Sequence, residues 1–386
     1  MRIDSIQTFC PTVGKRPQVL VRVATDTGLV GWGEAGLSAR GRAIAGAVEH
    51  MARFLVGQDP LRRDALWQES YRSQYYEGGR VIAAAIAAID IALWDIAGKH
   101  FEAPLYELLG GRSRHSVPCF ATAKGGSAEE LVAACELLVR EGWSVIRTGF
   151  AHGDAGDDGL RFEPRESIAL TAAWLTEVRR AIGPGPVLGI DYHHRLTLPE
   201  AVSFCQRMSA GTLDFLEEPM RCEDESAYAR LRSQITVPLA IGEELTSKWD
   251  FRRYIESGLT DFVRADVCNA GGITEARKIA AMAEAHYIDL MPHNPLGPIC
   301  TAATAHLASA IPNFAWLEVR ETPTEDEQVS DRALFSGIPR QDGPFIRLLD
   351  APGHGVAVDE GVLADRGSAW FEPPHLHRGD GSITNW

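Results

Sequence analysis

The chain has few cysteines for its length, and none of the seven lies in a C-x-x-C pair. They are odd in number and scattered, which argues against a disulfide framework and against a cysteine-based zinc site. We interpret them as reduced, buried thiols. The opening segment, MRIDSIQTF, also lacks the apolar region of a signal peptide. Both observations predict a cytoplasmic protein.

Positive charge and long hydrophobic runs are also scarce. Lys and Arg number 38 against 52 Asp and Glu, for a net charge of −14. Nucleic-acid binding requires a clustered basic face, so we expect no such partner. The most apolar stretch, residues 81–98, is interrupted by Asp90 and Asp95. It is shorter than a membrane span of about 20 residues, and we predict a buried helix and no membrane association.

What the sequence does contain is a regular series of short apolar runs, each closed by an ionisable residue. The runs VLGID, LDFLE, PLAIGE, FVRAD, LMPH and FAWLE end at Asp191, Glu217, Glu243, Asp266, His293 and Glu318. Helix-period segments separate them, and a strand plus a helix every ~25–30 residues is typical of parallel βα units. The pattern predicts an α/β fold of the (β/α)8 TIM-barrel type, in which the carboxyl ends of all strands meet at one mouth.

The first part of the chain lacks this rhythm. Strands are expected at 3–9, 18–24 and 29–33, and helices at 40–55, 60–73 and 79–99. We predict an α+β domain over 1–115, a barrel domain over 116–325, and a C-terminal segment, 326–386, that packs back on the first domain. Barrel strands are expected at 117–121, 144–149, 187–192, 213–217, 238–243, 261–266, 288–292 and 314–318. Thr274 is the expected N-cap of a helix at 274–285.

Three carboxylates end three successive predicted strands: Asp191, Glu217 and Glu243. A set of oxygen ligands without Cys or His describes a site for a hard cation. Mg²⁺ suits it best, and Mn²⁺ is the nearest substitute. Each acid taken singly could instead be a solvated strand-end residue or a helix cap.

Two histidines fall at the same predicted mouth. His193 lies two residues beyond Asp191, so strand alternation places both on one side. His293 ends the seventh strand, opposite the third in an eight-stranded ring, and Asp266 of the neighbouring strand could hold its imidazole in one tautomer. One imidazole could then take a proton from a bound ligand while the other gives one. The adjacent His194 is expected to be structural.

The segments DYH, FLEEP, GEE, RADVCNAGGITEARKIA and MPHNPLGPI resemble the enolase superfamily, specifically its mandelate racemase subgroup. WGE, GQDP and YYEGG extend the resemblance to a capping domain, so that it covers nearly the whole chain. HNPLGPI with DYH, and the SKWDF segment after Glu243, most resemble the galactonate dehydratases among the acid-sugar dehydratases.

The resemblance implies that the three strand-end carboxylates bind Mg²⁺, which chelates a substrate carboxylate. His293, paired with Asp266, would remove the proton α to that carboxylate. Glu318, in its protonated form, would help the metal to stabilise the enediolate. His193 would protonate the departing 3-hydroxyl, and the product would be a 2-keto-3-deoxy sugar acid. Homo-oligomers are expected, because related proteins form symmetric assemblies.

The second strand departs from the common family pattern. It reads VIRTG, without a Lys-x-Lys pair, and Arg147 and Gly149 stand where galactonate-type enzymes tend to have Lys and Asn. Arg147 stays protonated, so we assign it to substrate anion binding, with an ion pair to a barrel-mouth carboxylate as the alternative. Four loop residues are candidates for binding the sugar hydroxyls: Tyr75, Tyr76, Lys124 and His152.

Two other functions remain open. The same two histidines could act as opposed bases in a racemase or epimerase, or in a cycloisomerase of a sugar lactone. The barrel could also be catalytically silent and only bind sugar acids. The substrate is expected to be a small carboxylate, an aldonate or an aldarate.

Overall fold

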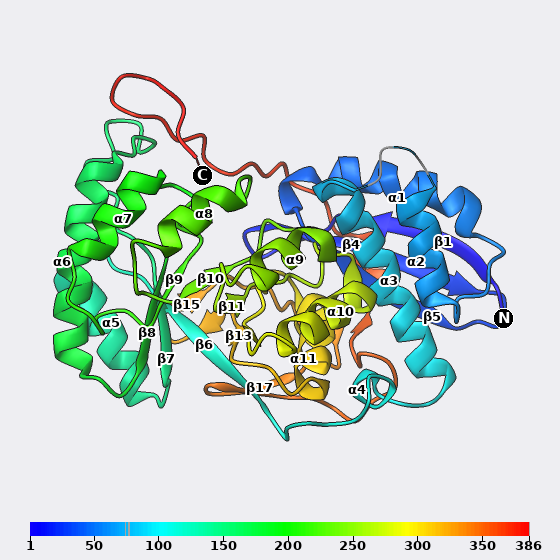
Figure 1. Ribbon diagram of the computed structural model, residues 1–386. Helices are drawn as coiled ribbons and strands as arrows, with labels where there is room; N and C mark the ends of the chain where they lie inside the picture. Colours follow the sequence, from blue (N-terminus) through cyan, green and yellow to red (C-terminus); the bar gives the residue numbers. More distant parts are fainter. Residues whose placement is uncertain (74, 76–77, 386) are drawn as a thin grey trace.

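The computed structural model describes residues 1–73, 75 and 78–385 and shows two bodies packed together (Figure 1). The body at the right of Figure 1 contains the N-terminus and combines a small sheet with long helices. The other is a ring of parallel strands surrounded by helices. The predicted fold class, a (β/α)8 barrel with an N-terminal α+β domain, is confirmed.

The first body is built on an antiparallel sheet of order β1–β4–β5, formed by Ile3–Phe9, Val19–Thr25 and Val30–Ala35. A short hairpin, β2 (Thr12–Val13) and β3 (Arg16–Pro17), lies between the first two of these strands. The helices are α1 (Gly41–Leu55), α2 (Arg63–Arg72), α3 (Arg80–His100) and α4 (Leu105–Leu108), after the short 3-10 helix Ser38–Arg40. The first three helices lie within three residues of their predicted bounds.

Helix α3 packs closely against β5 because that strand carries glycine at the contact. A Cβ atom at Gly33 would lie only 1.8 Å from the carbonyl oxygen of Ala88. Among the described residues, α3 is the one helix long and apolar enough to cross a membrane, but 89% of its apolar window is buried within the protein. It is therefore a core helix, as predicted.

The barrel has eight parallel strands in sequence order, and β13 pairs with β6 to close the ring. They are β6 (Val117–Ala123), β7 (Val145–Thr148), β8 (Val187–Asp191), β9 (Phe215–Glu217), β10 (Leu239–Ile241), β11 (Phe262–Val263), β12 (Asp289–Leu290) and β13 (Leu317–Glu318). The surrounding helices are α5 (Ala128–Arg140), α6 (Pro164–Ile182), α7 (Leu198–Gln206), α8 (Glu225–Arg232), α9 (Lys248–Glu256), α10 (Gly272–Glu284) and α11 (Pro298–Ala310).

Side chains of the barrel strands and of the segments next to them fill the interior of the ring. One buried cluster consists of Phe120, Val145, Phe215, Ala240, Met291 and Ala315. The Phe215 ring fits because β8 has Gly189 opposite it, where a Cβ would lie 2.1 Å from the ring.

Several barrel strands end earlier than predicted. The expected strands at 238–243, 261–266 and 288–292 stop at Ile241, Val263 and Leu290. At the first of these, the backbone N–H groups of residues 242 and 243 donate to the Glu218 carboxylate, 2.6 and 3.1 Å away, instead of to a neighbouring strand. Glu243, Asp266 and His293 therefore lie on loops just beyond the ends of β10, β11 and β12.

The C-terminal part of the chain contacts both bodies. Leu334, Phe335 and Val356 share a buried cluster with Trp32 of the first domain. This part contains β14 (Glu321–Thr322), β15 (Glu325–Asp326), β16 (Phe335–Ser336), β17 (Arg340–Asp342), β18 (Phe345–Arg347), β19 (Ala357–Val358) and α12 (Glu360–Ala364). Strand β18 also pairs with barrel strand β6. The predicted domain boundaries stay a prediction.

Two buried acids of the first domain join it to the barrel. Glu34, at the end of β5, accepts hydrogen bonds from the N–H groups of Gly297 (2.7 Å) and Cys300 (2.9 Å), where α11 begins. Asp90 of α3 accepts from both the N–H (2.9 Å) and the hydroxyl (2.5 Å) of Thr274 in the first turn of α10. Carboxylates are favourable at helix N-termini, where backbone N–H groups lack partners.

The contact with Asp90 corrects the sequence-based assignment of the α10 cap. Helix α10 begins at Gly272, and Gly271 is its N-cap residue. Thr274 lies inside the first turn, and the prediction that it caps the helix is wrong. The cap comes from α3, which no local sequence signal reveals.

The ionisation of Glu34 gives a testable pH dependence of stability. Burial raises the pKa of Glu34 to about 7, although the two N–H groups oppose the rise. The folded protein therefore binds this proton more tightly than the unfolded chain. The stability from this group is complete below the unfolded pKa of about 4.5 and is lost as the pH rises through about 7.

We expect the free energy of unfolding of Glu34→Gln to lack the pH-dependent contribution of the Glu34 carboxyl group. The wild-type value minus the variant value should fall by on the order of 2–3 kcal/mol between about pH 4.5 and about pH 7. Urea unfolding at a series of pH values measures it, and Glu49→Gln, at an exposed position of α1, is the matched control. A difference that stays constant with pH would contradict the prediction.

Candidate active site

A cavity of about 680 Å³ opens at the mouth of the barrel and is lined by residues of both bodies. The end of β8 supplies Asp191, the barrel loops supply His193, Glu243 and His293, and the first domain supplies several arginines. The C-terminal segment contributes residues 371–375. A larger and more open hollow of about 990 Å³ runs along residues 321–331, but no histidine lines it.

The three predicted metal-binding carboxylates come together at this mouth. One ligand oxygen each of Asp191, Glu217 and Glu243 lies within 4.8 Å of the other two. Burial raises the pKa of Glu217 to about 8, and Asp191 adds to this while Arg264 lowers it. Three crowded carboxylates are stabilised by a shared cation, and their oxygens fit Mg²⁺.

Oxygen Oδ2 of Asp191 supports this assignment. It is buried, and its nearest partners among the described residues are His193 Nε2 at 3.0 Å and Arg147 Nη1 at 3.4 Å. Burial raises the pKa of Asp191, but His193 and Arg147 both lower it, and the result is a pKa below the usual value. The oxygen is therefore an anionic acceptor at the cluster, as a ligand of a hard cation must be.

Two arginines form ion pairs with the carboxylates of Glu217 and Glu318. Arg147 of β7 contacts Glu217 (3.1 Å), Glu318 (2.9 Å) and the Thr122 hydroxyl (3.1 Å). Arg264 is fully buried and contacts the same two carboxylates, each at 2.7 Å. The ion pair left open as an alternative for Arg147 is therefore present, and its role in substrate binding stays a prediction.

These arginines change the expected state of Glu318. Burial alone raises the pKa of Glu318, but Arg147 and Arg264 outweigh it and hold that pKa well below the usual value. Both arginines therefore disfavour the protonated Glu318 that the resemblance implies, because buried guanidinium groups favour the ionised carboxylate. The role of Glu318 stays a prediction.

His293 and Asp266 form a hydrogen-bonded pair. His293 Nδ1 lies 2.8 Å from Asp266 Oδ2, which leaves Nε2 facing the carboxylates, 3.7 Å from Glu243. Burial lowers the pKa of His293, but Glu243 and Asp266 outweigh it and raise the pKa to about 9. A cation bound by Glu243 would offset the largest of the raising contributions. Nε2 is then placed to act as a base.

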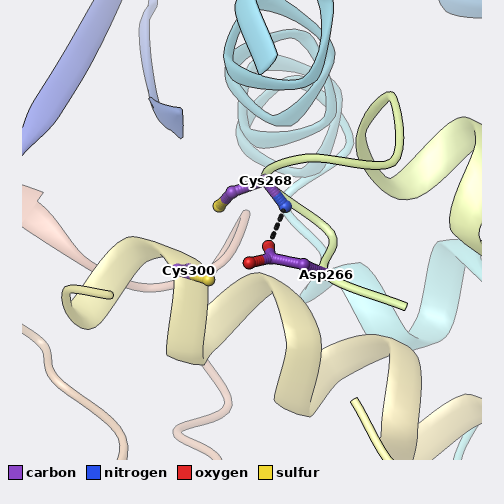
Figure 2. Close-up of side chains that lie close together, drawn as sticks. All are labelled: Asp266, Cys268 and Cys300. Carbon is purple, nitrogen blue, oxygen red and sulfur yellow. Dashed lines mark hydrogen bonds between the residues drawn. The ribbon is translucent and has the colours of Figure 1, made fainter. Parts of the chain in front are cut away.

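Asp266 is itself fixed by its surroundings. Its carboxylate accepts hydrogen bonds from the N–H of Cys268 (2.7 Å) and from the amide of Asn269 (2.9 Å). Figure 2 shows this carboxylate beside Cys268 and Cys300, the latter on α11. Burial raises the pKa of Cys300 to about 12 and holds that of Cys268 well above its usual value, so both stay thiols. We interpret this group as packing behind the His293–Asp266 pair.

His193 approaches the carboxylates from another strand end. Its N–H donates to Asp191 Oδ1 at 2.8 Å, and its side chain is 31% exposed to the cavity side. The backbone at His193 is left-handed, with φ of 46°. The turn thus folds the imidazole back over Asp191, and the two predicted catalytic histidines both reach the carboxylate cluster.

The comparisons with known proteins agree with this architecture. Residues 1–110 match the N-terminal domain of the mandelate racemase / muconate lactonizing enzyme family, and residues 130–362 match its enolase C-terminal domain-like partner. The chain belongs to this family. The predicted membership is confirmed.

Relatives of the family cover the chain from end to end. It is 35% identical to the D-galactonate dehydratase of Variovorax paradoxus, over all of both chains. A structure of an enolase from Pantoea ananatis with bound D-gluconate and Mg is 28% identical, with a TM-score of 0.91 over 100% of this chain and 99% of that one. The 3,6-anhydro-D-galactonate cycloisomerase from Zobellia galactanivorans is 29% identical, with a TM-score of 0.82 over 95% and 99%.

Two residues of this family member were not assigned a site role from its sequence. Arg264 precedes Asp266 by two positions, so strand alternation could have placed both at the mouth. His194 contacts Glu243 (3.0 Å) and lies 3.4 Å from both Glu218 and Glu244. It is structural as expected, but it holds a candidate metal ligand. Its backbone is left-handed, with φ of 60°, so the alternation of side chains along a strand does not predict where His194 points.

Three of the four loop candidates of this family member do not line the cavity. Lys124 pairs with Glu325 at the barrel edge, and His152 lines a separate hollow of about 600 Å³. Tyr75 is 98% exposed, and Tyr76 lies outside the described residues. The contact of Lys124 forms because the C-terminal segment brings Glu325 beside the end of β6. The structure therefore lends no support to sugar binding by Lys124, His152 or Tyr75.

Proposed function

We propose that the chain is a Mg²⁺-dependent hydro-lyase that dehydrates a sugar acid, an aldonate or aldarate, to a 2-keto-3-deoxy sugar acid. One observation carries the proposal: two imidazoles from different strand ends reach a single cluster of three carboxylates, and one of them is backed by a buried aspartate. The full-length similarity to D-galactonate dehydratases supports the same reaction.

Different residues of the site bind the metal and accept the α-proton. Asp191, Glu217 and Glu243 would hold Mg²⁺, which when bound supplies positive charge for the substrate carboxylate as its α-proton leaves. His293 Nε2 accepts that proton, while Asp266 keeps the other ring nitrogen protonated and stabilises the imidazolium. Mn²⁺ is the expected substitute metal.

His193 acts in the second half of the reaction. It donates a proton to the 3-hydroxyl as the bond from C3 to oxygen breaks, and water leaves. The electron pair of the broken C–H bond forms the double bond of an enol, which tautomerises to the 2-keto acid. Glu318 contacts Arg147 (2.9 Å) and Arg264 (2.7 Å) and orders these two arginines beside the cluster.

A screen of aldonates and aldarates tests the proposal. Semicarbazide detects a 2-keto product, which we expect with at least one sugar acid and not with His193→Asn or His293→Asn enzyme. The absence of keto product from every sugar acid would overturn the proposal.

A second candidate has a specific observation in its favour. The structure of a 3,6-anhydro-D-galactonate cycloisomerase aligns with 95% of the chain. One of the two histidines could remove the α-proton and the other return a proton to the opposite face of the same carbon, as in an epimerase. In a cycloisomerase a C–O bond would form or break within one molecule, and neither reaction releases water. Consumption of a sugar acid or lactone in the same screen, without a keto product, would favour this candidate.

Removing the metal should abolish the activity. We expect EDTA treatment to eliminate turnover, and added Mg²⁺ to restore it. Asp191→Asn should weaken Mg²⁺ binding by at least about 10- to 100-fold, since one of three charged ligands is lost. Calorimetric titration with Mg²⁺ measures the affinity, and Asp4→Asn, at an exposed position, is the control. Full activity of Asp191→Asn would instead favour the reading in which these acids bind no metal.

Three further expectations remain proposals. We propose a cytoplasmic homo-oligomer, which sedimentation and fractionation test. We also retain the division of the chain into 1–115, 116–325 and 326–386, which limited proteolysis tests.

A further inference from the structure

Six arginines line the cavity, and five of them pair with carboxylates. Arg40 contacts Glu372 (2.8 Å), and Arg80 and Arg221 contact Glu244 (2.6 and 2.8 Å). Arg320 contacts Glu318 and Glu325, each at 3.2 Å. Arg147 contacts Glu217 and Glu318 as described above. These five guanidinium groups are therefore already neutralised by the protein.

Arg16, the sixth, is different. It lies on β3, in the short hairpin of the first domain, and donates a hydrogen bond to the carbonyl oxygen of Pro295. None of the ion pairs among the described residues includes it. Its neighbour Lys15 points elsewhere and pairs with Glu327 at 3.3 Å. Among the described residues, the carbonyl oxygen of Pro295 is thus the one acceptor to which the Arg16 guanidinium donates a hydrogen bond.

Arg16 is half-buried at the cavity wall. Burial lowers its pKa and the nearby Arg320 lowers it further, while three carboxylates raise it, those of Glu327, Glu318 and Glu34. No carboxylate forms a direct ion pair with it among the described residues, so a ligand carboxylate can. Pro295 lies two residues after His293, so the unpaired guanidinium faces the cavity beside the proposed catalytic base.

The charge of the whole cavity points the same way. Among the described lining residues, six acidic side chains accompany the six arginines. Two of these acids, Asp191 and Glu243, are candidate metal ligands, so four lining acids remain for six lining arginines. Arg16 is the lining arginine without an ion pair among the described residues, and a carboxylate of the substrate would supply one.

We infer that Arg16 binds a second carboxylate, at the end of the substrate away from the metal-bound one, so that the site prefers an aldarate over an aldonate. The inference rests on the proposed function. A guanidinium forms two parallel hydrogen bonds with a carboxylate, whereas the terminal hydroxymethyl group of an aldonate offers no charge. The cavity, at about 680 Å³, lies in the range of small-molecule sites.

Calorimetry on the His293→Asn enzyme, saturated with Mg²⁺, tests the inference without turnover. We expect galactarate to bind about 10- to 100-fold more tightly than galactonate, the range for a hydrogen bond to a charged group. In Arg16→Met this ratio should fall to about one, with the affinity for galactonate changed by less than about threefold. Arg16→Lys should keep part of the preference.

The neighbouring position provides the matched control. Lys15→Met removes an adjacent charge that pairs away from the cavity, and the ratio should not change. Equal affinity for the two ligands, or an equal loss of both in Arg16→Met, would overturn the role of Arg16 and leave the proposed dehydratase intact. If Mg²⁺ binds but neither sugar acid does, the proposed function fails together with this inference.

Discussion

Replacing His293 with asparagine is expected to lower kcat for dehydration by about 10⁴-fold, with Mg²⁺ affinity nearly unchanged. His293 Nε2 faces the carboxylate cluster while Nδ1 is held by Asp266 at 2.8 Å. Asparagine cannot accept the α-proton, but it retains a polar group of similar reach. Asp266→Asn should also be severely impaired, because the amide favours the wrong tautomer of the imidazole.

Exchange of the substrate's α-proton with solvent distinguishes the role of His193 from that of His293. In deuterated water, His193→Asn should still exchange the α-proton of the substrate, since His293 remains, but should not release water. His293→Asn should do neither, and proton NMR of the recovered substrate measures the difference. His286→Asn, at an exposed position, is the control. Exchange that persists in His293→Asn and disappears in His193→Asn would reverse the assigned roles.

Replacing Arg264 with methionine is expected to lower the free energy of unfolding by about 3–5 kcal/mol. The Arg264 side chain is fully buried and contacts Glu217 and Glu318, each at 2.7 Å. It also donates to the carbonyl oxygens of Met291 and Pro292, at 2.8 and 2.9 Å, directly before His293. Its loss leaves two buried carboxylates short of positive charge and frees the backbone that carries His293.

Urea unfolding measures this loss, and a surface arginine gives the matched control. Arg252 and Glu256 lie 3.7 Å apart on α9, both more than half exposed. Arg252→Met should therefore change the stability by less than about 1 kcal/mol. A loss in Arg264→Met no larger than in this control would show that the buried network contributes little.

The barrel and its carboxylates were predictable because one local rule generates both. Each βα unit repeats the same period, and the residue that ends a parallel strand must face the mouth. This rule placed Asp191, Glu217 and Glu243 together, and it also placed Asp266 beside His293. It needs only the hydrophobic pattern and the direction of the chain.

Other parts of the site depend on contacts that no local pattern encodes. His194 reaches Glu243 through two successive left-handed residues, which strand alternation does not anticipate. Arg16 lines the cavity because a hairpin of one domain docks on a loop of the other. The low pKa of Glu318 follows from two arginines, one on β7 and one just after β11. Long-range packing decides all three.

The carboxylates of Glu34 and Asp90 carry a consequence for hybrid proteins. They accept hydrogen bonds at the N-terminal ends of α11 and α10, the helices that follow the loops carrying His293 and Asp266. Both acids belong to the first domain and not to the barrel. An isolated barrel would expose the ends of two helices beside its own proton-transfer residues. Chimaeras that exchange first domains between relatives should therefore tolerate new substrate loops only if an acid is kept at both positions.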